Sequence, residues 1–159
     1  MRAKIRQLIL DFPGLHLREL ARQADTSLHL VQYHAQRLQD DGDIHISLEG
    51  GKVRVFPPEL SKVERAVMGA LRDKQRSRIV LTLLEEGELA HGDLVRRLKI
   101  GKSTLSFHLR TLVEQGVVQR DEGLRLRDEA AVRDLMGRYR STPDAADRMA
   151  GIWGSIYKD

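Results

Sequence analysis

Two stretches of this 159-residue chain align with each other at a constant offset of 74 positions. Identical residues recur along the match, namely Leu15, Leu20, Arg22, His34, Leu38 and Gly42 on one side and Leu89, Leu94, Arg96, His108, Leu112 and Gly116 on the other. Similar residues recur in the same phase, such as Val31 with Leu105. Self-similarity at a fixed offset indicates one structural unit present twice. We therefore expect two copies of a small domain.

Each copy has the pattern of three short helices. An apolar helix over 5–10 or 79–84 precedes a break at Pro13-Gly14 or at Gly87. Apolar residues at helical spacing over 17–24 or 91–98 then predict a second helix. The third helix buries Val31 or Leu105 and is expected to end at Gly42 or Gly116, with that glycine in the left-handed conformation.

A β-hairpin is predicted after each third helix. In the first copy its strands are 44–48 and 53–56 around Gly50-Gly51, and in the second they are 117–120 and 124–127 around Gly123. Three helices and a hairpin describe a winged helix-turn-helix. The expected fold class is mainly α with small β-hairpins (α+β). The expected domains are 1–58, a connecting helix over 59–76, a second winged-helix domain over 77–127 and a helical tail over 128–159.

The third helix of the second copy carries a family resemblance. The run from Ser103 to Val118, STLSFHLRTLVEQGVV, resembles the recognition helix and following strand of ArsR-type and MarR-type transcriptional regulators. The run from Val31 to Ile44 is similar, but matches more loosely. Over nearly its full length the chain also resembles archaeal regulators that carry two winged-helix domains and end in a helical tail. The resemblance implies an intracellular DNA-binding regulator.

The outward side of the second copy's third helix is polar. With Leu105 in the core, a rotation of 100° per residue places Ser103, Ser106, Phe107, Arg110 and Thr111 on the opposite side. Between Arg96 and Val113 every charged residue is basic. Such a surface suits a phosphate backbone, because each neutralised phosphate releases condensed counterions.

Individual contacts follow from side-chain chemistry. Lys99, Lys102 and the positively polarised start of the helix are predicted to meet phosphates. Arg110 is predicted to contact a base, because its forked donors match the guanine edge in the major groove. In the hairpin, Arg120 and Arg125 are expected to reach flanking phosphates, partly opposed by neighbouring acidic residues.

The first copy has a weaker version of this surface. Its predicted contact residues are His29, Gln32, Tyr33 and Gln36 on the third helix, with Lys52 and Arg54 in the hairpin. Leu28 stands where the second copy has Lys102. We therefore expect the second unit to bind DNA strongly and the first unit to bind weakly or to serve another purpose.

Plainer interpretations of these residues stay open. A basic helical face is often only a solvated surface. Tyr33 and Phe107 can stack on nucleotides or pack against a hairpin or a partner. His34 and His108 border the core, and a conformational role there is favoured over metal binding because neither has a carboxylate at ligand spacing.

The connector and the tail add two expectations. Leu60, Val63, Val67 and Leu71 fall at helical spacing, and the outer side of this connector is expected to be basic. In the tail, a helix beginning near Thr142 and Pro143 has a wide apolar face. Its residues Met149, Ile152, Trp153 and Ile156 are predicted to form a homodimer interface. The alternative is that the tail packs back on its own chain.

Composition excludes several classes of protein. The formal net charge of +4, from 27 Lys and Arg against 23 Asp and Glu, is too small to establish a nucleic-acid partner by itself. There is no cysteine, which excludes disulfide scaffolds and thiolate zinc sites and is compatible with the reducing cytoplasm. The longest apolar run, 79–84, is far too short to cross a bilayer, and the first ten residues lack a signal peptide's apolar core.

These observations predict a cytoplasmic, sequence-specific transcriptional regulator. It would bind duplex DNA by placing the helix from Lys102 to Thr111 in the major groove, without a cofactor or a metal. The alternative is a protein-protein or RNA-binding module of a larger assembly, because winged helices serve many partners. An enzyme is not indicated, since the chain has no P-loop, no nucleotide-binding glycine pattern and no His/Glu metal motif.

Overall fold

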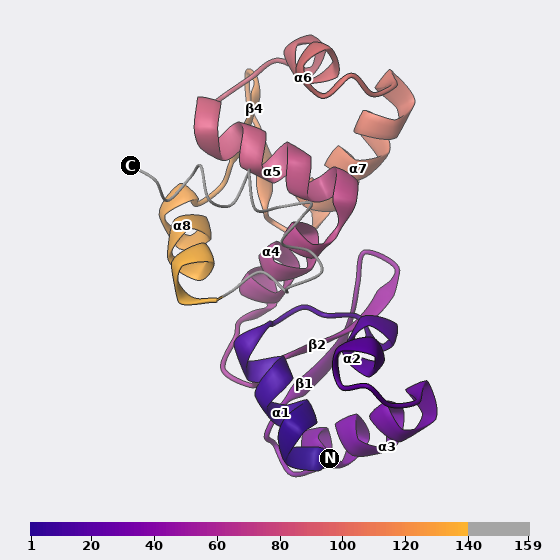
Figure 1. Ribbon diagram of the computed structural model, residues 1–159. Helices are drawn as coiled ribbons and strands as arrows, with labels where there is room; N and C mark the ends of the chain where they lie inside the picture. Colours follow the sequence, from indigo (N-terminus) through magenta and orange to yellow (C-terminus); the bar gives the residue numbers. More distant parts are fainter. Residues whose placement is uncertain (140–159) are drawn as a thin grey trace.

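The structure, a computed structural model, describes residues 1–139 and consists of two winged helix-turn-helix units (Figure 1). The first unit contains α1 (Arg2–Asp11), α2 (Leu17–Gln23), α3 (Leu28–Asp40), β1 (His45–Glu49) and β2 (Lys52–Phe56). The second contains α5 (Lys74–Glu86), α6 (His91–Leu98), α7 (Lys102–Glu114), β3 (Val118–Arg120) and β4 (Leu124–Leu126). Helix α4 (Lys62–Arg72) joins the units, and α8 (Glu129–Arg138) follows the second. The predicted fold class is confirmed.

Each third helix begins and ends as its sequence indicates. The Ser27 side chain caps α3 by accepting the Leu30 N–H, whereas Gly101 leaves α7 without a side-chain cap. Gly42 and Gly116 have φ values of 78° and 79°, the left-handed conformation that glycine adopts at no steric cost. The apolar residues of both helices face inward, with Val31, Ala35, Leu38, Leu105, Leu109 and Leu112 buried.

Two antiparallel hairpins form the wings. Strand β1 pairs with β2 from His45 opposite Phe56 to Glu49 opposite Lys52, and β3 pairs with β4 over three residues each. A single bridge adds a short third strand to each wing, at His16 with Arg54 and at Leu89 with Leu124. The strands begin and end within one residue of their predicted limits.

Strand β2 lies between two hydrophobic cores. Val55 belongs to the core of the first unit, while Phe56 belongs to the larger core that contains α4, α5, α6, α7 and α8. Consecutive side chains of a strand point to opposite faces, so one strand serves both cores. Helix α4 approaches this wing closely at Gly69, where an added Cβ would lie 3.2 Å from Glu49 Cβ. The first wing is therefore packed on both faces.

The connecting segment differs from its prediction. In place of one helix over 59–76 the chain forms α4 and α5, which meet at Asp73 in an extended conformation. The Asp73 side chain accepts the Arg76 N–H and so caps α5. Consequently the predicted boundary between 76 and 77 falls inside α5, and α4 packs into the core of the second unit.

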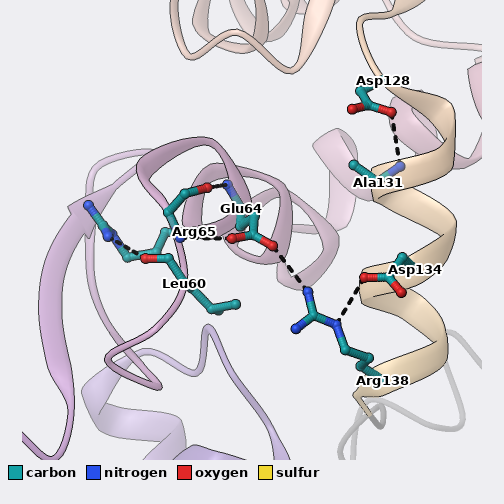
Figure 2. Close-up of polar contacts among 8 residues, drawn as sticks. Leu60, Glu64, Arg65, Asp128, Ala131, Asp134 and Arg138 are labelled. Atoms are coloured by element: carbon teal, nitrogen blue, oxygen red, sulfur yellow. Dashed lines mark hydrogen bonds and ion pairs between the residues drawn. The ribbon is translucent and has the colours of Figure 1, made fainter.

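Helix α8 is fixed to α4 by one carboxylate (Figure 2). Glu64 completes a capping box with Ser61 at the start of α4, and its second oxygen accepts a hydrogen bond from Arg138 at 3.1 Å. The hydrogen bond from the Ser61 backbone helps hold the pKa of Glu64 below its ordinary value. Arg138 also pairs with Asp134 at 3.0 Å. Val132, Leu135 and Met136 are buried, so this part of the tail packs on its own chain.

The four residues predicted to form a dimer interface, Met149, Ile152, Trp153 and Ile156, lie outside the described residues.

Candidate nucleic-acid interface

Helices α6 and α7 and the turn between them form the helix-turn-helix of the second unit. Leu94 and Leu98 of α6 are buried with the apolar residues of α7, and this packing fixes the angle between the two helices. Lys99 in the turn has a φ of 54°, and Asp25 at the matching position of the first unit has a φ of 53°. The backbones of the two turns are alike, but their charges are opposite.

Most of the predicted contact residues of the second unit lie on its surface. Lys99, Lys102, Ser103, Phe107 and Arg110 are exposed. None of the three basic residues in this set forms an ion pair with any residue in 1–139. The first N–H groups of α7 have no side-chain acceptor at the N-cap, because that residue is Gly101. This arrangement leaves cationic and hydrogen-bonding groups available to an anionic partner.

Two predicted contact residues of α7 are partly engaged already. The Ser106 hydroxyl lies 3.1 Å from His91 Nε2, which places α6 against the middle of α7. The Thr111 hydroxyl donates to the Phe107 carbonyl at 3.4 Å. Both side chains are only partly exposed. They lie at the edge of the exposed surface rather than at its centre.

Two of the basic residues near this surface are paired with carboxylates in the folded structure. Arg96 pairs with Asp93 in the same helix, and Arg97 pairs with Glu86 from α5. The run without acidic residues between Arg96 and Val113 therefore meets carboxylates from outside it. These two arginines are therefore less available to an anionic partner than Lys99, Lys102 and Arg110.

The second wing has one free and one paired arginine. Arg120 is exposed and forms no ion pair among the described residues. Arg125 pairs with Asp121 across the wing, with Nε 3.0 Å from Oδ2. This bond contributes most to holding the pKa of Asp121 below its ordinary value. The sequence predicts that neighbouring acidic residues partly oppose the arginines of this wing, and Asp121 does so at Arg125.

In the first unit, the predicted contact residues of α3 are also at the surface. His29, Gln32, Tyr33 and Gln36 are exposed. Gln36 donates to Asp40 at 3.0 Å, and the Arg37 guanidinium lies 5.7 Å from the centre of the Tyr33 ring. Gln36 and Tyr33 are therefore already engaged by neighbours on the same helix.

The two predicted contacts in the first wing have different outcomes. Lys52 is exposed and borders a pocket of about 360 Å³ together with His16, Arg18 and Gln32. Arg54 is only 1% exposed and donates to the Gly14 carbonyl at 2.7 Å. A phosphate contact by Arg54 does not fit this position, because its side chain lies on the Phe56 face of β2 against α4.

Several basic residues of the connector are likewise not on an outer surface. Arg72 donates to the Pro13 carbonyl at 3.0 Å, and Arg76 is only 3% exposed. Burial, with the charge of Arg54 second, lowers the pKa of Arg72 to about 10. The expectation of a basic outer side is wrong at these positions, because the first unit covers them.

Exposed aromatic rings occur at the same place in both third helices. Tyr33 is 53% and Phe107 is 64% exposed. Each ring meets the following histidine edge-on, with centroids 5.3 Å apart. His34 and His108 are partly buried, at the border of the core where the sequence placed them.

Two residues on these surfaces escaped prediction. Arg18 is exposed beside Lys52. The matching residue of the second copy is Gly92, so comparison of the two copies did not indicate a basic contact at this position. His91 lies in the predicted second helix, but its contact with Ser106 depends on the angle between two helices. Sequence spacing does not report that angle.

Residues 1–139 contain no group of three His, Cys, Asp or Glu side chains placed to hold a metal ion. No helix within that range is long and apolar enough to span a membrane.

Comparison with family models gives a helix-turn-helix match in each half of the chain. Residues 1–68 match a family described as an N-terminal HTH domain. Residues 73–120 match the family described as bacterial regulatory protein, arsR family. Together with the fold, these matches define the chain as a tandem winged helix-turn-helix protein, a class that is not enzymatic. Its second unit is similar to the arsR regulators, as the resemblance of residues 103–118 predicts.

A curated relative extends over both units. An uncharacterised HTH-type transcriptional regulator of Methanocaldococcus jannaschii is 24% identical over 126 residues, which cover 79% of this chain. The chain spans about a third, 32%, of that relative's length. Among solved structures, the mRNA-binding domain of elongation factor SelB from E. coli in complex with SECIS RNA matches 80% of this chain and 97% of its own. Its identity is 17% and its TM-score is 0.34, too low to support an inference.

Proposed function

We propose that this protein is a cytoplasmic transcriptional regulator that binds duplex DNA sequence-specifically, with α7 in the major groove. Lys99 and Lys102 would bind phosphates, and Arg110 would contact a guanine edge. Ser103, Ser106, Phe107 and Thr111 would line the same groove, while Arg120 and Arg125 would reach the flanking backbone.

The observation that carries this proposal is the availability of three cations on one helix-turn-helix. Lys99, Lys102 and Arg110 are exposed and form no ion pair within residues 1–139. A fixed helix with a polar outer side and unpaired cations matches the geometry by which winged helices enter the major groove. The match of residues 73–120 to arsR regulators supports the same function.

Salt-dependent binding tests the proposal. Duplexes selected from a random pool are titrated with the protein between about 50 and 200 mM salt, where specific complexes with several phosphate contacts weaken steeply. Lys102→Ala is expected to flatten the plot of log affinity against log salt by about one unit, because one phosphate contact is lost. Leu28→Ala, at the matching place in the first unit, serves as the control and should leave the slope unchanged.

Two outcomes would contradict the proposal. If no duplex is enriched from the pool, sequence-specific binding is wrong. If binding is insensitive to salt, an apolar protein interface becomes the better account, in line with the alternative of a protein-protein module.

We further propose that the protein is a homodimer formed through Met149, Ile152, Trp153 and Ile156, so that two copies bind two half-sites. An apolar stripe at helical spacing over these residues supports this proposal. Ile152→Asp is expected to convert dimers into monomers in sedimentation, because a carboxylate in an apolar interface is costly. An unchanged mass would remove this role.

A further inference from the structure

A pocket of about 390 Å³ lies between the tip of the first wing and helix α7 of the second unit. In Figure 1 the β1–β2 hairpin points toward the lower end of α7. Its lining includes Leu48 and Gly50 of the wing, Arg76 of α5, Phe107 and His108 of α7, and Gln115 at the C-cap of α7. The pocket is thus built from both units.

Arg76 is a buried cation with unused donors. Its Nε lies 3.5 Å from Asp73 Oδ2, and its side chain is 4% exposed. Neither terminal nitrogen of its guanidinium donates a hydrogen bond to a residue in 1–139. The wing lies directly over the group, since a Cβ added to Gly50 would be 1.9 Å from Nη2. Donors of a buried guanidinium without acceptors are costly unless something else satisfies them.

The first unit has a carboxylate at a position where the second unit has none. Position 76 matches position 2, and position 115 matches position 41, at the same offset of 74. In the first unit Arg2 pairs with the Asp41 carboxylate. In the second unit the carboxylate is replaced by Gln115, whose Nε2 donates to Glu49 at 3.3 Å and whose buried Oε1 has no partner. The second unit keeps the arginine but has an amide at the matching position, so Asp73, on the Nε side, is the carboxylate that pairs with Arg76.

Carboxylates surround the arginines near the pocket. Arg54, Arg72 and Arg76 are packed between the units with Glu49 and Asp73, and the charge of Glu19 also acts on Arg72. Burial, followed by the charge of Arg76, lowers the pKa of Arg54 to about 10. One further carboxylate, Glu114, lines the pocket at its exposed edge. At the floor of the pocket, the two terminal nitrogens of Arg76 are cationic donors without an acceptor among residues 1–139.

The mouth of the pocket is apolar. Leu48 is 70% and Phe107 is 64% exposed, the two largest exposed fractions among the large apolar side chains in residues 1–139. They line the same pocket as Arg76. A ligand that fills it would thus carry an anionic end and an apolar body.

We propose that this pocket binds a small organic anion, a carboxylate or phosphate ester with a flat apolar body. Arg76 takes the anionic oxygens through its free terminal nitrogens, in the fork geometry suited to such groups. A hydroxyl or N–H of the ligand meets Gln115 Oε1, and its apolar body lies between Leu48 and Phe107. At 3% exposure Arg76 is too recessed for a phosphate of a rigid duplex, which favours a free ligand.

Such a ligand would regulate DNA binding. Phe107 and Thr111 line this pocket and also belong to the surface proposed to enter the major groove. A bound anion there adds negative charge and bulk beside that surface, so duplex affinity is expected to fall. This consequence depends on the proposed function, whereas ligand binding does not.

Binding is tested on the full-length protein without DNA, by calorimetry and by NMR of the Arg76 side-chain N–H groups. The probes are phenyl phosphate, inorganic phosphate and phenol. Phenyl phosphate is expected to bind at least about tenfold more tightly than inorganic phosphate, because it adds apolar contact to the charge-assisted hydrogen bonds. Phenol should not bind measurably, because it lacks the anion.

The decisive variant is Gln115→Asp, which restores the carboxylate of the first unit while leaving Arg76 in place. It should weaken phenyl phosphate at least about tenfold, because the internal carboxylate occupies the guanidinium. Arg2→Gln, at the matching position of the first unit, is the control and should leave binding unchanged. Thermal unfolding monitored by circular dichroism verifies that both variants are folded.

Three results would overturn the proposal. These are no saturable binding of phenyl phosphate to the wild-type protein, equal binding to Gln115→Asp, or equal loss in Arg2→Gln. If phenyl phosphate does not bind but Gln115→Asp weakens duplex binding, the anion is a DNA phosphate and the free ligand is wrong. If phenyl phosphate binds and no duplex does, the pocket stands and the proposed function fails.

Discussion

The helix-turn-helix segments of the two units share one backbone and differ in charge. Residues 16–44 contain three Arg or Lys and five Asp or Glu, a net charge of −2, whereas residues 90–118 contain five and two, a net charge of +3. The buried positions of α3 and α7 nevertheless match one for one. The apolar pattern and the glycine that ends the helix determine the fold, so the outer side is free to change its chemistry.

The two wings differ as well. The base of the first lies between the core of its own unit and α4, while the second packs on α5 with its tip in solvent. The first wing therefore contributes to the cores of both units, through Val55 and Phe56.

The largest difference between the two units is expected in base recognition. Arg110→Ala is expected to weaken binding to a cognate duplex by about 1–3 kcal/mol and to relax the preference at one base pair, because a bidentate contact is lost. Gln36→Ala, at the matching position of the first unit, should change it by less than about 0.5 kcal/mol, as is usual for surface substitutions. Fluorescence anisotropy with cognate and single-mismatch duplexes measures both.

Equal losses for the two variants would remove the assigned difference between the units. A loss for Arg110→Ala that is the same on every sequence would reduce this residue to a phosphate contact.

A smaller effect is expected at the starts of the third helices. Ser27→Ala should lower the free energy of unfolding by about 1 kcal/mol, because the Leu30 N–H loses its acceptor. Gly101→Ser should raise it by a few tenths of a kcal/mol, roughly the preference for Ser over Gly at an N-cap. Urea denaturation followed by circular dichroism measures both changes. A stabilising Ser27→Ala would contradict the assigned cap.

The smallest effect is a pH dependence of the first unit. Burial lowers the pKa values of His16 and His45, both in this unit, so its folded state disfavours their protonated forms. Their contribution to stability is complete above the ordinary value of 6.5 and is lost as the pH falls below it. Protonation of His16 Nδ1 also removes the acceptor of the Glu19 N–H.

Amide hydrogen exchange at about pH 7.5 and 5.5 should therefore show weaker protection of α1, α2 and α3 at the lower pH, after correction for intrinsic rates. His16→Asn keeps an acceptor at the start of α2 but does not titrate, so it should reduce the effect. An equal loss of protection in α5, α6 and α7 would show that these histidines are not its source.

The fold was largely predictable because it depends on local pattern. Apolar spacing located the helices, and Gly42 and Gly116 marked the ends of the third helices. The break at Asp73 was missed, because the apolar spacing of the connector ends at Leu71 and the bond that begins α5 involves one side chain.

The candidate interface was predictable only where exposure follows from one helix. Arg110 is exposed because it lies opposite Leu105 on α7, and Lys102 is exposed because it is the first residue of that helix. Arg54 was misplaced, since nothing local indicates that α4 covers the second face of its strand. Arg96 pairs with Asp93 within α6, but the ion pair of Arg97 depends on the position of Glu86 in α5. Gln115 meets Glu49 only through the contact between the two units.

Helix α4 contacts the first wing on one side and α8 on another, and Arg138 is hydrogen-bonded to its first turn. The last turn of α8 is consequently bonded to the helix that joins the two units. Loss of this hydrogen bond would release the end of α8 from the joining helix without altering either helix-turn-helix.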